Sequence, residues 1–108
     1  MSAAATNLVS ELTQRGETLS FCESLTAGLA SATVASVPGA SAVLRGGLIT
    51  YATEVKSLFL RQPVADNEAA GVVSGDTALA MARAAVAETD ADWGIGLTGV
   101  AGGGGGKR

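Results

Sequence analysis

Residues 18–28, TLSFCESLTAG, decide how this chain folds. Thr18 to Cys22 is typical of a short buried strand, and Glu23, Ser24 and Thr26 follow it directly. Small hydroxyl residues before a glycine favour a turn that leads into a helix, where Ser and Thr cap the first N–H groups. Residues at the carboxyl end of a parallel strand also lie where open α/β proteins bind ligands. The stretch therefore predicts a strand, a turn and a helix, with either a structural or a functional role for the hydroxyls.

Helices and strands are predicted to alternate on both sides of this stretch. The predicted helices cover residues 3–15, residues 26–36, a segment that is capped by Thr53 and ends by Pro63, and a longer segment capped by Ser74. The predicted strands cover residues 18–22, 46–51 (from Val43 at the earliest) and 93–98, and residues 63–73 are predicted as loop. This order predicts one domain over residues 1–108, a three-layer α/β/α fold with a mostly parallel sheet or a mixed one. Residues 99–108 are predicted as a flexible Gly-rich tail.

Composition and charge narrow the classes of function. The chain has 108 residues, 47% of them hydrophobic, and a formal net charge of −3. No long basic run exists, so we expect no direct contact with nucleic acid. No stretch approaches the roughly 20 apolar residues that span a bilayer, and the N-terminus does not resemble a secretory signal. A single cysteine, Cys22, cannot form an internal disulfide, which favours a cytoplasmic location.

The sequence contains no histidine. Catalytic Ser-His-Asp and Cys-His arrangements are therefore excluded within this chain, and so is a His-ligated metal site. With one cysteine as well, we expect no metal and no cofactor. Acid–base chemistry near neutral pH must depend on a carboxylate, a lysine, a tyrosine or water.

Polar side chains follow each predicted strand, and in a parallel sheet they would meet at one edge. This arrangement groups Ser24, Tyr51, Lys56 and Thr98. If Thr53 caps its helix, Lys56 lies in the first turn, where the helix dipole disfavours a positive charge. A neutral lysine amine can deprotonate a serine hydroxyl, as Ser-Lys sites do without histidine.

Each of these residues also has a structural interpretation. Ser24 and Thr26 could act only as helix caps, Lys56 could be a solvated surface lysine, and Tyr51 could pack at a strand end. Thr98 and the glycine after it are also typical of an ordinary turn. Backbone N–H groups after Ser24 and Thr98 could bind a phosphate or an oxyanion.

Several short motifs together resemble a known family. They are CESLTAG at 22–28, VPGAS at 37–41, RGG at 45–47, YATEVK at 51–56, VS at 73–74 and TGVAG at 98–102. The chain resembles the C-terminal domain of the CinA (competence/damage-inducible) proteins, which also occurs alone as nicotinamide-nucleotide amidase. The family pattern has Ala-Glu-Ser-Cys-Thr-Gly-Gly, Val-Pro-Gly-Ser-Ser, Arg-Gly-Gly, Tyr-Ser-Asn-Glu-x-Lys, Val-Ser and Thr-Gly-Ile-Ala-Gly in this order.

The resemblance implies deamidation of nicotinamide mononucleotide to nicotinic acid mononucleotide and ammonia. It implies catalytic roles for Ser24, Ser41, Tyr51, Lys56 and Thr98. We expect substrate contacts from Thr26, Gly28, Gly46, Gly47 and Gly99. Ser41 precedes a predicted strand and would lie at the opposite edge from Tyr51, so either residues 40–45 fold back or Ser41 acts in another way. The predicted geometry favours Ser24 as the nucleophile, and an alternative interpretation of the family pairs Ser41 with Lys56.

The chain also departs from the family pattern. Leu25, Ala27 and Ala40 replace the usual Cys, Gly and Ser. The family continues beyond the last motif through a Gly-Pro-x-Gly loop into further strands and a helix, so we expect a domain truncated at its C-terminus. An uncovered strand at residues 93–98 favours a homo-oligomer. The alternative function is a nucleotide-binding or scaffold module of the same fold without turnover.

Overall fold

Three parallel strands form the middle layer of the structure, a computed structural model in which residues 2–61 and 75–99 are described. The strands are β1 (Leu19–Glu23), β2 (Leu44–Ile49) and β3 (Trp93–Leu97), and their order in the sheet is β2-β1-β3. Both pairings of β1 are parallel. Within the described ranges the sheet is therefore wholly parallel, which confirms the α/β prediction. The predictions for residues 63–73, Ser74 and residues 100–108 lie outside the described residues.

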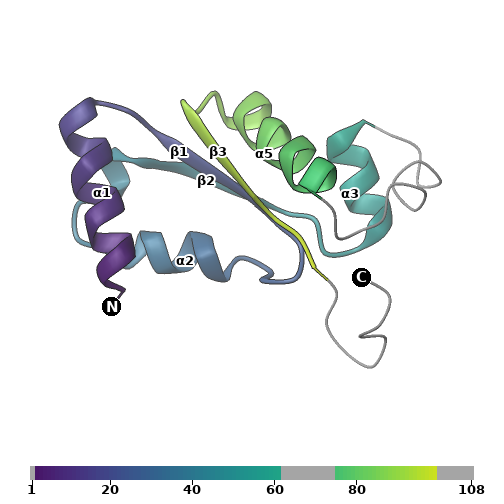
Figure 1. Cartoon of the computed structure of the whole chain (residues 1–108), viewed down its shortest axis with the longest axis horizontal. Helices are drawn as coiled ribbons and strands as arrows, with labels where there is room; N and C mark the ends of the chain where they lie inside the picture. Colours follow the sequence, from purple (N-terminus) through teal and green to yellow (C-terminus); the bar gives the residue numbers. More distant parts are fainter. Residues whose placement is uncertain (1, 62–74, 100–108) are drawn as a thin grey trace.

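Helices cover both faces of this sheet. The helical segments are α1 (Ala3–Arg15), α2 (Leu29–Ala35), the short 3₁₀ turn η1 (Ala40–Ala42), α3 (Thr53–Leu60) and α5 (Gly75–Thr89). Figure 1 shows α1 and α2 on one face and α3 and α5 on the other. The chain therefore leaves β1 and β2 toward opposite faces, an arrangement that opens a crevice at the carboxyl ends of the strands. No helix in the described ranges is long and apolar enough to span a membrane.

Several element boundaries differ from the predicted ones. Helix α2 begins at Leu29 and not at residue 26, because Ala27 (φ 52°) and Gly28 (φ 103°) are left-handed and cannot belong to an α-helix. Ala52, not Thr53, is the N-cap of α3. The same helix ends at Leu60, since Arg61 adopts a left-handed conformation that closes it.

The shifts in the strands have a simpler cause. β1 extends one residue further than predicted, to Glu23, and β2 occupies Leu44–Ile49 where residues 46–51 were expected. The pairing aligns Glu23 with Ile49, so the two strands end level with each other. The register with β1, which no local pattern encodes, determines where β2 starts and stops.

The strand at the centre of the sheet is buried along its whole length. Leu19 and Phe21 pack with α1 and α2, whereas Cys22 packs with Met81 and Ala85 of α5 on the other face. This alternation follows from the period of two of an extended strand. The same alternation places the Glu23 side chain on the face of Phe21, where it points toward α2.

Small residues let α5 approach the sheet closely. A Cβ atom on Gly96 would overlap the carbonyl oxygen of Ala78, and one on Gly94 would overlap that of Ala82. The alternation of apolar residues with glycine in β3 therefore has a packing cause. The close approach of α5 fixes the end of β3, and with it the position of Thr98.

Candidate functional site

The hydroxyl of Thr98 lies between two of the predicted site residues. The Lys56 Nζ atom donates to Thr98 Oγ1 at 3.2 Å, and Ser24 Oγ lies 3.5 Å from the same oxygen. The Ser24 backbone N–H donates to the Leu97 carbonyl at 2.9 Å, which ties the end of β1 to the end of β3. Ser24, Lys56 and Thr98 come from three separate segments. The structure thus brings them together at the carboxyl edge of the sheet, as the parallel topology predicted.

Lys56 is a buried amine. Its side chain is only 4% exposed, on the first turn of α3, and none of the ion pairs among the described residues includes it. Burial lowers the pKa of Lys56 below its ordinary value of 10.5, and the nearby Cys22 opposes that shift. The interpretation of Lys56 as a solvated surface lysine is therefore wrong. A buried amine with a lowered pKa is suited to accept a proton.

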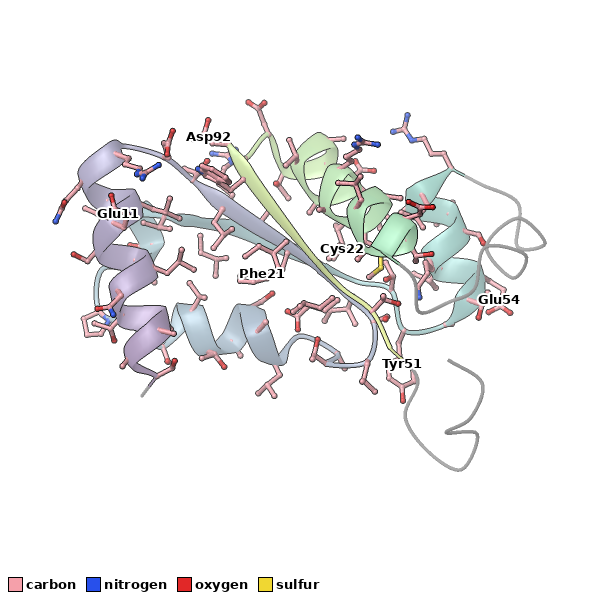
Figure 2. The ribbon with its side chains drawn as sticks, in the orientation of Figure 1. Glu11, Phe21, Cys22, Tyr51, Glu54 and Asp92 are labelled. Atoms are coloured by element: carbon pink, nitrogen blue, oxygen red, sulfur yellow. The ribbon has the colours of Figure 1, made fainter. Side chains whose placement is uncertain are left out.

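Cys22 and Thr50 lie close to one another in the interior beside this amine. The Cys22 Sγ atom lies 3.7 Å from Thr50 Oγ1, and both side chains are fully buried. Burial raises the pKa of the Cys22 thiol, and the opposing effects of Thr50 and Lys56 are smaller. A neutral, inaccessible thiol is not a nucleophile. Figure 2 shows Cys22 beneath α5.

Glu23 is a functional candidate that we did not assign from the sequence. Its carboxylate is fully buried and accepts five hydrogen bonds from the segment that follows it. Burial alone would raise the pKa of Glu23, but hydrogen bonds from Ser31, Thr26 and Ala30 outweigh it, so the pKa is lowered. One sequence signal could have identified Glu23. It is an acidic residue at the end of a buried strand, followed by several small residues whose backbone N–H groups can donate to it.

Thr26 is one of these donors and not a helix cap. Its hydroxyl donates to Glu23 Oε1 at 2.6 Å, and the N-cap of α2 is Gly28, which has no side chain to offer. Ser24 does not cap the helix either, since its Oγ donates to the Leu97 carbonyl at 3.4 Å or to Thr98. The prediction that Ser24 and Thr26 act only as helix caps is therefore wrong.

Tyr51 lies at the same edge but faces solvent. Its side chain is 65% exposed and projects beyond the carboxyl end of the sheet (Figure 2). Within the described ranges no hydrogen bond connects it to Ser24, Lys56 or Thr98. Its catalytic role stays a prediction.

Ser41 lies at the other end of β2. It is an exposed residue of η1, just before the strand begins, whereas Lys56 follows the strand's carboxyl end. The chain does not fold back there to bring Ser41 to the carboxyl edge. The topology thus favours Ser24 over Ser41 as the partner of Lys56 within one chain, and the role of Ser41 stays a prediction.

The glycines expected to contact substrate fall into two groups. Gly28 and Gly99 lie at the carboxyl edge, where Gly28 donates its N–H to Glu23 and Gly99 lies against the Leu25 side chain. Gly46 and Gly47 lie within β2, below the helices, and Cβ atoms there would meet Thr89 and Ser31 respectively. The contact at Gly47, 2.6 Å from Ser31 Oγ, is too close for a Cβ atom, so packing requires a glycine there, whereas 3.5 Å at Gly46 would accommodate one. Substrate contact by any of these glycines stays a prediction.

The described part of the chain holds no group of three or more Cys, Asp or Glu side chains arranged to bind a metal ion. The chemistry available at the edge is that of two hydroxyls, one amine and backbone N–H groups. Among the described contacts, the N–H groups of Leu25 and Thr26 have no protein acceptor. Such a set can attack and stabilise a carbonyl centre.

The amino-acid sequence of the chain is similar to those of known proteins. A family described as the CinA C-terminal domain matches residues 1–108. A putative competence-damage inducible protein of Streptococcus pneumoniae (strain ATCC 700669 / Spain 23F-1) is 50% identical over 98 residues, which are 91% of this chain and 23% of the relative. The counterpart from strain JJA is 49% identical over the same share. The chain thus spans about a quarter of the length of these curated relatives.

Solved structures agree with this match. The competence/damage inducible protein CihA of Agrobacterium tumefaciens superposes with a TM-score of 0.75 at 32% identity, covering 82% of this chain and 53% of that one. The competence or damage-inducible protein of Enterobacter asburiae gives a TM-score of 0.75 at 27% identity, covering 82% and 55%. The present chain thus spans about half the length of the solved chains.

Proposed function

Because the chain belongs to the CinA C-terminal domain family, we propose that it is an amidohydrolase that converts nicotinamide mononucleotide to nicotinic acid mononucleotide and ammonia. One observation supports this proposal more than any other: the Thr98 hydroxyl contacts both Ser24 and the buried amine of Lys56. This arrangement offers a nucleophile, a base and a hydroxyl between them. The substrate is the one that the family resemblance implies.

In the proposed reaction Ser24 is the nucleophile and Lys56 the base. Ser24 Oγ attacks the carboxamide carbon, while its proton passes through the Thr98 hydroxyl to the neutral amine of Lys56. The protonated amine then returns this proton to the leaving nitrogen as the C–N bond breaks, so that ammonia departs and an ester to Ser24 remains. Water hydrolyses the ester by the same proton path in reverse and gives the acid.

The surroundings of Lys56 favour the neutral amine that this step needs. The side chain is buried, and among the described residues no carboxylate forms an ion pair with it. The N-terminal turn of α3, with its partial positive charge, acts in the same direction. We assign Tyr51 to donate to the bound nucleotide, and the N–H groups of Leu25 and Thr26 to stabilise the oxyanion.

Ammonia release from nicotinamide mononucleotide tests the proposal directly. We expect Lys56→Ala to abolish release above background, whereas Arg61→Ala, which removes an exposed cation just after the same helix, leaves it unchanged. Release that survives Lys56→Ala would contradict the assigned base. Release that is absent from the unsubstituted chain as well would contradict the amidohydrolase itself.

A pair of serine variants separates the two candidate nucleophiles. We expect Ser24→Ala to abolish ammonia release and Ser41→Ala to leave most of it, because Ser41 is exposed at the far end of β2. The reverse result would assign the attack to Ser41. It would require a second copy of the chain to supply Ser41, since β2 separates this residue from Lys56 within one copy.

The second candidate is a nucleotide-binding or scaffold module without turnover. It is favoured by the long contact between Ser24 Oγ and Thr98 Oγ1, 3.5 Å, and by the exposure of Tyr51 to solvent. Titration calorimetry with nicotinamide mononucleotide distinguishes the two functions. Heat of binding without product would favour the module, and binding accompanied by ammonia would favour the amidohydrolase.

A further inference from the structure

The buried carboxylate of Glu23 ends β1, next to the proposed nucleophile. We propose that Glu23 is a positioning residue: it holds the turn of residues 24–28 so that the Ser24 hydroxyl stays beside Thr98. This inference rests on the proposed function, because it assigns a second residue to the same site. Glu23 touches neither Lys56 nor Thr98 in the described contacts, so its action on the reaction passes through Ser24.

Both carboxylate oxygens of Glu23 are used. Oε1 accepts from Thr26 Oγ1 at 2.6 Å, from the Ala30 N–H at 2.9 Å and from the Gly28 N–H at 3.2 Å. Oε2 accepts from the Ser31 N–H at 2.8 Å and from Ser31 Oγ at 2.6 Å. Only an ionised carboxylate accepts from all of these donors at once. A glutamine in this place would direct an N–H₂ group at donors on one side.

The turn that these bonds hold is conformationally unfavourable by itself. Ala27 has φ 52° and Gly28 has φ 103°, so two consecutive residues are left-handed. An alanine disfavours this region because its Cβ crowds the following carbonyl. Such a conformation persists only where the surroundings fix it. Glu23 supplies that restraint through bonds to residues before and after Ala27.

Ser24 lies between this restraint and β3. Ser24 directly follows Glu23 in the chain, and its own N–H donates to the Leu97 carbonyl of β3 at 2.9 Å. Among the described residues its hydroxyl makes only longer contacts, at 3.4 and 3.5 Å, to Leu97 and Thr98. The position of the hydroxyl therefore depends on the backbone of the turn and not on strong hydrogen bonds of its own.

Gly47 of β2 also takes part in this arrangement. A Cβ atom on Gly47 would lie 2.6 Å from Ser31 Oγ, the hydroxyl that donates to Glu23 Oε2. The bare backbone of β2 leaves room for Ser31 to reach the carboxylate. This packing explains why a glycine is needed at that position, independently of any contact with substrate.

The test compares Glu23→Gln with Asp92→Asn, a matched loss of a carboxylate at the amino edge of the same strands. Asp92 Oδ2 accepts from the Thr18 N–H at 2.8 Å and from Thr18 Oγ1 at 3.1 Å, far from the turn of residues 24–28. Two quantities are measured for each variant, at a temperature the same number of degrees below its own Tm. One is kcat and KM for ammonia release, and the other is the rate at which a fluorophosphonate probe labels Ser24.

We expect Glu23→Gln to lower kcat and the labelling rate by tenfold or more, with a smaller change in KM, and Asp92→Asn to keep both rates within twofold. Equal losses in the two variants, or rates within twofold in folded Glu23→Gln, would overturn the inference. So would the absence of labelling in the unsubstituted chain, since Ser24 would then not be reactive. If Ser24 is labelled but no ammonia is released, the proposed function fails while the labelling ratio still decides the role of Glu23.

Ser31→Ala serves as a milder variant where Glu23→Gln does not fold. It removes one of the five hydrogen bonds and leaves the backbone donors in place. We expect a labelling rate about threefold lower, and restoration of the rate by Ser31→Thr, which keeps the hydroxyl. A labelling rate unchanged by Ser31→Ala would contradict the role of Glu23.

Discussion

Lys56 combines two properties that rarely occur together in a stable protein, namely an ionisable amine and almost complete burial. Lys56 is 4% exposed, and among the described residues its amine forms a hydrogen bond with a neutral hydroxyl, that of Thr98. Burial of an uncompensated charge costs free energy of folding. Retaining such a residue is thus a cost to stability that the proposed proton transfer would explain.

We expect Lys56→Met to separate stability from activity. Methionine has a similar length and no charge, so the free energy of unfolding at neutral pH should stay the same or rise by about 1–2 kcal/mol. Ammonia release should fall by about a hundredfold or more, as for the loss of a general base. Urea unfolding and the ammonia assay measure the two effects, and a fall in both would indicate that Lys56 serves only the fold.

The same residue predicts how stability depends on pH in the alkaline range. Since the pKa of Lys56 in the folded chain is below the ordinary 10.5, the unfolded chain binds more protons between these two values. The free energy of unfolding contributed by Lys56 therefore rises as the pH increases toward 10.5. Urea unfolding over an alkaline pH series should show this rise in the unsubstituted chain and a smaller one in Lys56→Met.

Glu23 predicts the opposite behaviour in acid. Its pKa is lowered in the folded chain, so its contribution is complete above the ordinary value of 4.5 and is lost as the pH falls through the folded pKa. At neutral pH we expect Glu23→Gln to lower the free energy of unfolding by about 1–3 kcal/mol, because buried donors lose their acceptor. The difference between the two proteins should shrink below pH 4.5. A constant difference across this range, measured by chemical unfolding, would contradict the assignment.

At the scale of the elements, α1 and β3 were predicted to within a residue, whereas β2 and the start of α2 were displaced by two or three residues. The pattern of β3 predicted its strand almost to the residue, since apolar residues alternate with glycine in WGIGL. The start of α2 was predicted three residues too early, because Ala27 and Gly28 are left-handed, and no residue pattern in this stretch specifies the hydrogen bonds of Glu23 that surround them.

The candidate site was predicted through topology more than through local pattern. Parallel strands bring Ser24 and Thr98 to one edge, and this followed from the order of elements. The burial of Lys56 did not follow, since it depends on how α3 packs beside the sheet. The five hydrogen bonds of Glu23 could not be predicted either, because they need the turn of residues 24–28 in place.

The contact between α5 and β3 gives a prediction at this scale. We expect Gly96→Ala to lower the free energy of unfolding by about 1–3 kcal/mol, because the new methyl group would overlap the Ala78 carbonyl and push the helix away. Gly75→Ala adds the same methyl to the helix where nothing lies within 4 Å, so it should be neutral or slightly stabilising. Thermal unfolding measures both, and equal Tm values for the two variants would contradict the packing.

At the scale of the whole molecule, β2 and β3 are both edge strands within the described ranges, and the edge at β3 is the one that has apolar grooves beside it. In the described part of the chain β3 pairs only with β1. Open grooves of about 350 Å³ and 220 Å³ lie beside it on the α1 face, and both include Ile95 and Leu8. Trp93, at the start of the strand, is 48% exposed. A strand whose outer edge has no partner among the described residues, next to apolar grooves, favours association.

We expect the chain to form a homo-oligomer through β3, with a sedimentation coefficient that increases with concentration. Trp93→Lys should weaken the association, because a lysine at an edge strand opposes pairing and can still approach Glu17, the present partner of the indole N–H. Leu58→Lys, on the exposed side of α3, should not change it. Sedimentation velocity of the three proteins checks this, and a constant monomer in all of them would contradict it.

The direction of the hydrogen bonds in β3 has a consequence for any strand that adds there. The Trp93 N–H and the Leu97 carbonyl both point inward, to Thr18 and Ser24, so the peptide groups of Gly94 and Gly96 are the ones turned outward. Those two residues carry no side chain to screen their amides or to distinguish one arriving polypeptide from another. The side chains of Trp93, Ile95 and Leu97 lie on one face of β3. Selectivity for the sequence of an added strand would therefore depend on contacts with these three side chains.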